Sequence, residues 1–418
     1  MTAGTVYVVG AGLAGLAAAV ALAGRGARVE VIEAAPQAGG RCRSWFDVQL
    51  QDVIDNGNHL ILSGNNATFD YLRAIGAEDR VMGPDDARFA FCDVRTGERW
   101  TIAPNMGALP WWVFSHRRRV PGTQAIDYVR LARLLLRYPG KRVRDVIACE
   151  GPLWERLTRP FLLAALNSAP EDASAELACA VLRETLARGG SFCRPRIATP
   201  NLAAAFVEPA LAFLARQGAQ IRFGERLRGV EFGGSAIAAL ELSESQIVLS
   251  PADSVILAVP SWIATALLPG IAAPDQSSAI VNAHFRAAPG HDVPKMVGVI
   301  GGTVEWIFAF PNRISVTVSG ADAIVECGRS ELAQLLWRDV AAVYGLSQAL
   351  PPWQIVKEKR ATFLATAAQT AKRAPAQTRW KNVFLAGDWT ATGLPATIEG
   401  AIRSGQKAAR LAAGETVR

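Results

Sequence analysis

The chain has 418 residues, of which 50% are hydrophobic, and it carries a formal net charge of +7. A chain of this length and composition can bury a large core and suggests two or three domains. No run reaches the roughly 18 uninterrupted apolar residues of a membrane-spanning helix, so neither a transmembrane span nor a cleaved signal is expected. The six cysteines lack metal-ligand or C-x-x-C spacing, which is typical of reduced thiols in a cytoplasmic protein.

The first 33 residues predict a complete nucleotide-binding βαβ unit. Residues 5–9 are β-branched and aromatic, as in a short buried strand. A G-x-G-x-x-G fingerprint follows, and its expected binding residues are Gly10, Gly12, Leu13, Ala14 and Gly15. The first glycine permits a tight turn, the second lets the backbone approach a pyrophosphate, and the third lets the helix at 16–22 pack on the strand. A second strand at 28–32 ends in Glu33, whose carboxylate can accept hydrogen bonds from ribose hydroxyls.

The next stretch continues the pattern of a nucleotide site. Gly39, Gly40 and Arg41 supply a second glycine turn and a guanidinium suited to a diphosphate. Residues 45–58 predict a pair of strands leading to the run DNGNH at 55–59, and residues 68–75 predict a short helix.

From residue 81 to residue 195 the sequence predicts a largely helical region. Two short strands, at 87–94 and 98–102, precede an aromatic and basic block. Apolar periodicity then predicts three helices, at 125–137, 153–165 and 174–188.

The second half of the chain alternates between strands and helices. Residues 196–260 predict a helix, a strand at 219–223, a β-meander at 230–249 and a buried strand at 253–260. Residues 261–374 predict a helix and four further strands, which are expected near 296–299, 304–310, 314–319 and 355–359, with the helix at 331–344.

Near the C-terminus a buried strand at 383–386 delivers Gly387 and Asp388 to its carboxyl end, and Thr397 and Ile398 begin a last helix. The sequence as a whole predicts an α/β (mixed α+β) fold with two interleaved domains. A Rossmann-type dinucleotide-binding domain is expected at residues 1–80, 196–260 and 375–418, and a substrate domain of mixed sheet and helices at 81–195 and 261–374.

The glycine fingerprint, the G-G-R turn and the C-terminal G-D motif together resemble the flavin amine oxidase and phytoene desaturase superfamily, which holds FAD with these elements. The resemblance implies that Asp388 binds the ribityl–pyrophosphate region and that the backbone near Leu227 holds adenine. It implies that the segment carrying Gly57 and Asn58 passes close to the flavin ring, where Gly57 leaves room for it.

The last helix has an implied role as well. The resemblance implies that the helix starting near Thr397 points its positive end at the N1/O2 edge of the flavin, where it would stabilise the reduced anion. We expect FAD to be bound non-covalently, because the segment 387–395 contains no Cys or His that could tether it.

Within this superfamily the chain is similar to the squalene-associated FAD-dependent desaturase group, the hydroxysqualene dehydroxylases of bacterial hopanoid synthesis. The stretches that carry the similarity are residues 55–62, 153–175 and 387–401. The similarity implies an apolar isoprenoid substrate and reductive removal of its allylic hydroxyl by hydride from reduced FAD, giving squalene. A phytoene or carotenoid-type desaturase, an amine oxidase and a non-enzymatic lipid-binding flavoprotein are the alternatives. No second G-x-G-x-x-G for a nicotinamide nucleotide is present, so a flavin-reducing partner or free NAD(P)H is expected.

Candidate catalytic residues are few. No Ser-His-Asp, paired-carboxylate or metal-ligand pattern stands out, so we expect the cofactor to carry most of the chemistry and no metal. Carbon–oxygen cleavage needs a proton donor, and His59 is the candidate because the pKa range of histidine suits donation near neutral pH. Asp55 and Glu399 are reserves that require burial to raise their pKa. Structural roles for all three, a turn contact or a helix cap, are the alternative.

The aromatic and basic block predicts a surface role. Trp111, Trp112 and Phe114 directly precede Arg117–Arg119. Aromatic side chains beside arginines are typical of insertion at a membrane interface, whereas stacking of nucleic-acid bases and ordinary core packing are the alternatives. We expect a cytoplasmic protein attached peripherally to the anionic inner membrane, with no nucleic-acid partner.

Overall fold

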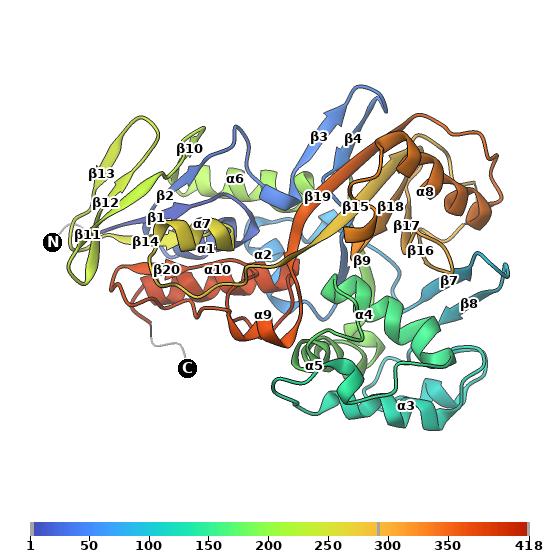
Figure 1. Cartoon of the computed structure of the whole chain (residues 1–418). Coiled ribbons are helices and arrows are strands. Elements are labelled where there is room, and N and C mark those ends of the chain that lie inside the picture. The colour runs from blue at the N-terminus through green and yellow to red at the C-terminus, as the bar shows by residue number, and fades with distance from the viewer. Residues whose placement is uncertain (1–3, 291–292, 416–418) are drawn as a thin grey trace.

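The computed structural model describes residues 4–290 and 293–415, and its two largest sheets lie at opposite ends of the molecule (Figure 1). The first sheet has five parallel strands in the order β10-β2-β1-β14-β20. These strands are Gln220–Phe223, Arg28–Glu33, Thr5–Val9, Ser254–Leu257 and Val383–Leu385. The sheet confirms the predicted nucleotide-binding strands, which come from three separate parts of the sequence.

Two helices from distant parts of the chain pack together beside this sheet (Figure 1). Helix α1 (Leu13–Ala23) connects β1 to β2, and helix α10 (Ile398–Ala412) lies against it. The backbones approach so closely that a Cβ on Gly405 would lie 2.0 Å from the carbonyl oxygen of Ala14. Two shorter helices are associated with the same half, α6 (Glu208–Arg216) and α7 (Ser261–Leu267).

The predicted β-meander is a separate three-stranded antiparallel sheet. Its strands are β11 (Gly229–Gly233), β12 (Ala236–Glu241) and β13 (Gln246–Val248). The alternating pattern of the sequence is therefore confirmed here.

The second large sheet has seven strands in the order β19-β15-β18-β17-β16-β7-β8. All neighbours are antiparallel except the parallel pair β16 and β7. Helix α8 (Arg329–Tyr344) covers one face, where it packs on a core of buried aliphatic residues. In sheet order the strands are Trp353–Phe363, Ser277–Phe285, Ile314–Val318, Trp306–Ala309, Met296–Ile300, Phe89–Asp93 and Arg99–Ile102.

Strand β15 was not predicted, although it is nine residues long and central to this sheet. Its sequence SSAIVNAHF carries Asn282 and His284 among apolar residues, so the strand does not read as a continuous apolar run. Both polar side chains are buried and hydrogen-bonded in the structure, which explains why the strand tolerates them.

The helical region lies below the seven-stranded sheet in Figure 1. The helix predicted at 125–137 is shorter and broken: α3 (Ala125–Leu131) continues as a 3₁₀ turn to Leu135. A π-helical turn (Trp154–Thr158) leads into α4 (Arg159–Leu166), and α5 (Ala175–Glu184) ends four residues before the predicted limit, where a 3₁₀ turn follows.

The remaining elements connect the two large sheets. Strands β3 (Ser44–Asp47) and β4 (Asp52–Asp55) form the predicted hairpin. Strands β5 (Leu60–Leu62), β9 (Pro195–Ala198) and β6 (Val81–Met82) form a three-stranded sheet in the order β5-β9-β6. Helix α2 (Asn66–Ile75) lies between β5 and β6 in the sequence, and the short helix α9 (Ala367–Ala371) precedes β20.

The structure confirms the mixed α/β fold class. Every strand of the five-stranded sheet falls in the ranges expected for FAD binding, and every strand of the seven-stranded sheet falls in the ranges expected for the substrate. The domain boundaries themselves stay a prediction. Within the described residues, no helix is both long enough and apolar enough to cross a membrane.

Candidate active site

A cavity of about 1090 Å³ lies between the two large sheets. Its wall includes the β1–α1 turn, the end of β2, the segments 39–43 and 56–62, one face of the seven-stranded sheet and the segment 387–401. The cavity therefore opens at the carboxyl ends of parallel strands, where open α/β sheets bind their ligands. Its volume is at the upper limit for a cavity that holds one small ligand.

The β1–α1 turn has the close backbone approach that its glycines predict. A Cβ on Gly10 would lie 2.5 Å from the carbonyl oxygen of Ala258, and one on Gly15 would lie 1.8 Å from the carbonyl oxygen of Gly10. A Cβ on Gly12 would meet no heavy atom within 4 Å. Because Gly12 lines the cavity, a side chain there would occupy the space that a pyrophosphate needs.

The second glycine turn packs directly on the first. Gly39 forms an isolated parallel bridge with Gly12, and a Cβ on Gly40 would lie 3.2 Å from the Cα of Gly12. Leu13 and Ala14 line the same space at the start of α1. The two turns thus form one cradle of backbone groups at a helix N-terminus, as anion binding requires.

The adenosine end of the cavity has two carboxylates. The Glu33 carboxylate accepts hydrogen bonds from the backbone N–H groups of Ala11 and Ala35, both at 2.7 Å, and also lines the cavity. Glu225 lines the cavity as well, and its buried Oε2 has no hydrogen-bond partner among the described residues. Leu227 is buried at this end, where its backbone was expected to hold adenine.

Arg41 and Asp388 meet across the cavity wall. Their Nη2 and Oδ2 atoms are 2.7 Å apart, and Asp388 raises the pKa of Arg41. Gly387 has φ of +145°, and a Cβ there would lie 2.6 Å from the indole nitrogen of Trp389, so no larger residue fits. The structure therefore brings together two residues that lie 347 positions apart in the sequence.

A buried guanidinium that the sequence did not reveal holds the loop after Asp388. Arg373 donates hydrogen bonds to the carbonyl oxygens of Asp388, Trp389 and Leu394, at 2.9, 3.3 and 2.7 Å, and to the Thr392 hydroxyl at 2.8 Å. Burial lowers the pKa of Arg373 to about 10. No local motif marks this residue, because its role depends on a loop that follows 15 residues later.

Helix α10 begins at the cavity as predicted. Thr397 caps it, since the Thr397 hydroxyl accepts a hydrogen bond from the Gly400 N–H at 3.1 Å, and Ile398 is its first residue. Both residues line the cavity, so the positive end of the helix faces the enclosed space.

Glu399 lines the cavity and also caps a different helix, as the structural alternative to its reserve catalytic role stated. Its carboxylate accepts hydrogen bonds from the N–H groups of Ala67 and Thr68, at 3.1 and 2.8 Å, and from the Thr68 hydroxyl at 2.7 Å. It also pairs with Arg403 at 2.7 Å. These four contacts engage the Glu399 carboxylate where α10 packs on α2.

A connected group of amides and a hydroxyl forms part of the cavity wall. The Asn58 amide donates to Thr317 Oγ1 at 3.3 Å, and Thr317 Oγ1 donates to Asn282 Oδ1 at 2.8 Å. Asn282 in turn donates to the carbonyl oxygen of Asn56 at 3.3 Å. A Cβ on Gly57 would lie 3.0 Å from the Asn282 amide nitrogen. Asn282 is therefore a close neighbour of Gly57, which also lines the cavity, and room for a flavin ring at this glycine stays a prediction.

His59 lines the cavity, and its surroundings disfavour the protonated form that proton donation needs. Burial, with a further contribution from the positive charge of Arg41, lowers the pKa of His59 to about 4. At pH 7 only about one His59 in a thousand would be protonated. Asp55 is not among the residues that line the cavity: its Oδ1 accepts hydrogen bonds from the Ser44 hydroxyl at 2.5 Å and the Leu202 N–H at 2.9 Å. Asp55 therefore fixes the local backbone, as the structural alternative stated.

Away from these groups the cavity is mainly apolar. The apolar arm lies between the seven-stranded sheet and α4, and its side chains are Phe89, Phe91, Ile102, Leu157, Phe161, Trp306 and Phe308.

The residues present fit a dinucleotide. The glycine cradle leaves space for a diphosphate beside a helix N-terminus, and the unpartnered Glu225 Oε2 offers an acceptor at the sugar end. Within residues 4–290 and 293–415, no group of three or more His, Cys, Asp or Glu side chains is placed to hold a metal ion.

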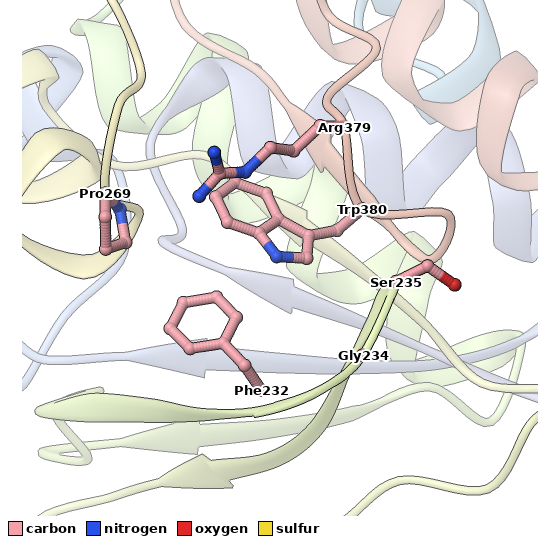
Figure 2. A pocket seen from close by; sticks show the side chains of 6 residues that line it. All are labelled: Phe232, Gly234, Ser235, Pro269, Arg379 and Trp380. Atoms are coloured by element: carbon pink, nitrogen blue, oxygen red, sulfur yellow. The ribbon is translucent and has the colours of Figure 1, made fainter.

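A smaller cavity, of about 370 Å³, lies beside the β-meander (Figure 2). Its wall contains the stacked rings of Phe232 and Trp380, whose centroids are 5.2 Å apart, and the Arg379 guanidinium above Trp380. Its six lining residues include no carboxylate, thiol or imidazole and none of the residues that line the large cavity, so the chemistry belongs to the large cavity.

Comparisons with known proteins agree with this geometry. Residues 13–413 match the family described as flavin containing amine oxidoreductase. The chain is 52% identical over 408 residues to the hydroxysqualene dehydroxylase of Rhodopseudomonas palustris, covering 97% of this chain and 98% of that protein. It is 50% identical over 411 residues to the hydroxysqualene dehydroxylase of Sinorhizobium fredii, covering 98% and 99%.

More distant likenesses are shorter or concern the fold alone. A stretch of 77 residues, 18% of the chain, is 36% identical to a protein of Synechococcus elongatus named for zeta-carotene desaturation. The solved structure of cyclohexylamine oxidase from Brevibacterium oxydans has a TM-score of 0.70 at 17% identity and covers 99% of each chain. An oxidoreductase from Methanosarcina mazei has a TM-score of 0.71 at 15% identity and covers 96% of this chain and 99% of the other.

Proposed function

The chain belongs to the family of flavin containing amine oxidoreductases, and on that premise we propose that it is an FAD-dependent hydroxysqualene dehydroxylase. The observation that carries the proposal is the 48–52% identity to three hydroxysqualene dehydroxylases over 97–98% of this chain. The reaction replaces an allylic hydroxyl of hydroxysqualene with hydrogen and gives squalene and water.

The desaturase and amine oxidase alternatives have weaker support. The likeness to the carotenoid enzyme is limited to 77 residues, and the likeness to amine oxidases lies at 17% identity, where only the fold is shared. An apolar arm lined by aromatic and aliphatic side chains suits a long isoprenoid and lacks a group that would recognise an amine.

The chain's own residues bind and orient the reactants. The glycine cradle would hold the diphosphate and Glu33 would hold the ribose. The pair Arg41 and Asp388 would hold the ribityl–pyrophosphate region, and the N-terminus of α10 would face the flavin ring. Bound FAD supplies a hydride in its reduced form. The apolar arm excludes water, which protects an allylic cation while the hydride is transferred.

We propose that the flavin is not covalently attached. The segment 387–395 has no tethering residue, and burial raises the pKa of the cavity thiol Cys42 to about 12, so this thiol is not a nucleophile at neutral pH. Acid precipitation of the purified protein should release all flavin into the supernatant. Flavin that stays in the pellet would contradict this part of the proposal.

Anaerobic single-turnover measurements test the function. The photoreduced protein is mixed with hydroxysqualene, the oxidised protein is mixed with phytoene, and the flavin spectrum and the products are followed. Hydroxysqualene should reoxidise the flavin and give squalene, whereas reduction of the oxidised flavin by phytoene would favour the desaturase. If the protein reacted with neither compound, a non-enzymatic lipid-binding flavoprotein would be the remaining alternative. Repeating the steady-state reaction with NADPH alone, and then with a cell extract, tests whether a separate flavin-reducing partner is needed.

We further propose peripheral attachment to an anionic membrane surface. Trp111 and Phe114 are 66% and 64% exposed, and Arg117 and Arg118 are exposed beside them. Trp112, in contrast, is only 6% exposed and packs edge-on against the Tyr128 ring, so its expected role in the anchor is wrong. The membrane patch is therefore defined by Leu109, Trp111, Phe114, Arg117, Arg118, Ile126 and Val129, and its apolar members are each at least half exposed.

The location of the patch supports this role. The 3₁₀ turn that carries Trp111 and Phe114 contacts α3, which presents Ile126 and Val129. The same region packs against the aromatic cluster that includes the apolar arm of the cavity. An apolar substrate dissolved in the bilayer would then meet the protein close to that arm, on the cytoplasmic side.

A further inference from the structure

We propose that Glu305 and Ser319 form a proton-delivery pair in the wall of the cavity, with the Ser319 hydroxyl facing the substrate and Glu305 supplying the proton through it. This inference rests on the proposed function, because it names the acid that departure of a hydroxyl as water requires.

The pair lies at the edge of two neighbouring strands. Glu305 directly precedes β17 and Ser319 directly follows β18, and these strands are paired with Trp306 opposite Thr317. The Ser319 N–H donates to Glu305 Oε2 at 2.8 Å, which places the short Ser319 side chain beside the carboxyl group. Ser319 lines the cavity, as do the neighbours Trp306 and Thr317, so its hydroxyl links the carboxyl group to the enclosed space.

The surroundings of Glu305 favour a neutral acid. No ion pair to Glu305 exists within the described residues; the nearest guanidinium, that of Arg159 on α4, is paired with Glu171 at 3.3 Å. On the other face, Asp339 of α8 accepts hydrogen bonds from the N–H groups before Glu305. Burial without a counter-ion raises the pKa of Glu305 to about 7. A large share of the molecules therefore holds a transferable proton at neutral pH.

The other acids of the cavity wall are less suited to donate. Asp388 and Glu184 pair with arginines at 2.7 and 2.6 Å, and Asp275 pairs with Lys372 at 2.8 Å. The salt-bridge partner occupies each of these carboxylates. Glu33 and Glu399 accept hydrogen bonds from backbone N–H groups. Glu358, whose carboxylate has the Asn56 amide at 3.4 Å, and Glu225, whose buried Oε2 has no hydrogen-bond partner among the described residues, are the remaining competitors.

The proposed step balances in atoms and electrons. Ser319 donates its hydroxyl proton to the substrate oxygen and takes the Glu305 carboxyl proton in its place. The carbon–oxygen bond breaks with its electron pair on oxygen, water leaves, and the allylic carbon accepts the hydride of the reduced flavin. Glu305 is left as a carboxylate and regains a proton from solvent after product release.

Isosteric variants test the pair in single-turnover reoxidation of the photoreduced protein by hydroxysqualene. Glu305→Gln should slow the reaction at pH 6 at least about tenfold, near the lower end for loss of a general acid. Its flavin content and thermal midpoint should match the wild type. The wild-type rate should fall as pH rises through about 7, because the donor loses its proton, and this fall should be absent in Glu305→Gln and restored in Glu305→Asp. Ser319→Ala should be slow, and Ser319→Thr should recover.

Two further readouts separate proton delivery from a structural role. Infrared difference spectra of the protein without substrate should show a carboxylic acid band at pH 5.5 that is lost at pH 8.5 and is absent in Glu305→Gln. An acetate ester of hydroxysqualene, whose leaving group needs no proton, should react equally fast with wild type and Glu305→Gln.

The outcomes distinguish the two proposals. Absence of wild-type turnover with hydroxysqualene overturns the function. Wild-type turnover together with an unchanged Glu305→Gln rate and pH profile overturns the relay alone. Loss of the pH-dependent fall in Glu358→Gln or His59→Ala, with Glu305→Gln unaffected, assigns the proton to that residue and also overturns the relay.

Discussion

The nucleotide cradle and the wall of the seven-stranded sheet are both parts of one cavity, yet they are built differently. The cradle comes mainly from residues 10–41, in which each glycine has a local reason that its spacing already indicates. The sheet wall is assembled from β15, β17, β18 and β19, and its polar contacts join residues that are 35 to more than 200 positions apart. Local spacing can thus encode a binding backbone, whereas an acid or amide inside an apolar wall is defined only by tertiary pairing.

Gly12→Asp should give the largest effect, a loss of FAD affinity. It tests whether the glycine motif forms the FAD-binding cradle. A carboxylate there would project into the cradle about 4 Å from a phosphate, where like-charge repulsion costs about 4 kcal/mol at an effective dielectric of about 20. That energy corresponds to roughly a thousandfold loss of FAD affinity, so the protein should purify colourless. The absorption spectrum is the measurement, and Gly107→Asp is the matched control, because Gly107 does not line the cavity. A full flavin spectrum in Gly12→Asp would break the assignment of the cradle.

Arg373→Met would test whether a non-local contact organises the second half of the cradle. The substitution removes four hydrogen bonds to the 388–394 loop and leaves three carbonyl oxygens without this partner. We expect the free energy of unfolding to fall by at least about 3 kcal/mol, since buried groups without partners are costly. Chemical denaturation measures the free energy of unfolding. The control is Arg379→Met, at an arginine that lies over the ring of Trp380, and it should change this free energy by less than about 0.5 kcal/mol. Equal effects of the two variants would show that the loop does not depend on Arg373.

The buried His284, in the seven-stranded sheet, should make the free energy of unfolding depend on pH. Burial lowers the pKa of His284 to about 3, and its imidazole contacts Ser315 Oγ at 2.8 Å and the Asp55 carbonyl oxygen at 3.0 Å. The unfolded chain takes up this proton below about pH 6.5 and the folded chain does not. Stability therefore falls as pH falls from about 6.5 towards about 3, by about 2 kcal/mol at pH 5. Denaturation midpoints between pH 5 and pH 7.5 measure this slope.

His284→Gln should flatten that slope, whereas His116→Gln, at an exposed position, should not. The lowered pKa of His59 should also reduce the free energy of unfolding as pH falls. The raised pKa of Glu305 has the opposite effect, since it reduces the free energy of unfolding as pH rises. The comparison of His284→Gln with wild type isolates one contribution. If the free energy of unfolding of His284→Gln depended on pH as steeply as that of the wild type, the His284 imidazole would not be held neutral in the folded protein.

The membrane patch should give the smallest effect. Trp111→Ser with Phe114→Ser removes two exposed aromatic side chains, and partial burial of each in the lipid interface should make affinity for anionic vesicles fall about tenfold. Vesicle sedimentation at two salt concentrations measures it, with Phe46→Ser plus Val48→Ser as the control pair on the exposed β3–β4 hairpin. If the two double variants sedimented equally with the vesicles, the membrane patch would not be the anchor.

These regions show how far sequence reasoning reaches. The strands and helices with a clear period, the glycine turns and the place of Asp388 were predictable, because each depends on neighbours in the sequence. Strand β15 and the role of Arg373 were not predictable. The polar side chains of β15 and the Arg373 guanidinium are explained only by hydrogen-bond partners in other segments of the chain. The surroundings that lower the pKa of His59 were not predictable for a related reason, since they include the charge of Arg41 and depend on packing.

The contact of α1 with α10 bears on how the protein is made. The nucleotide unit emerges early from the ribosome, but the Gly405 backbone that packs on Ala14 follows much later, as does β20 at the edge of the same sheet. At synthesis rates of about 5–20 residues per second, the early unit would wait roughly 20–75 s for these partners. During that time the apolar α1 surface lacks its α10 partner, and the part of the cavity wall formed by residues 387–401 does not yet exist.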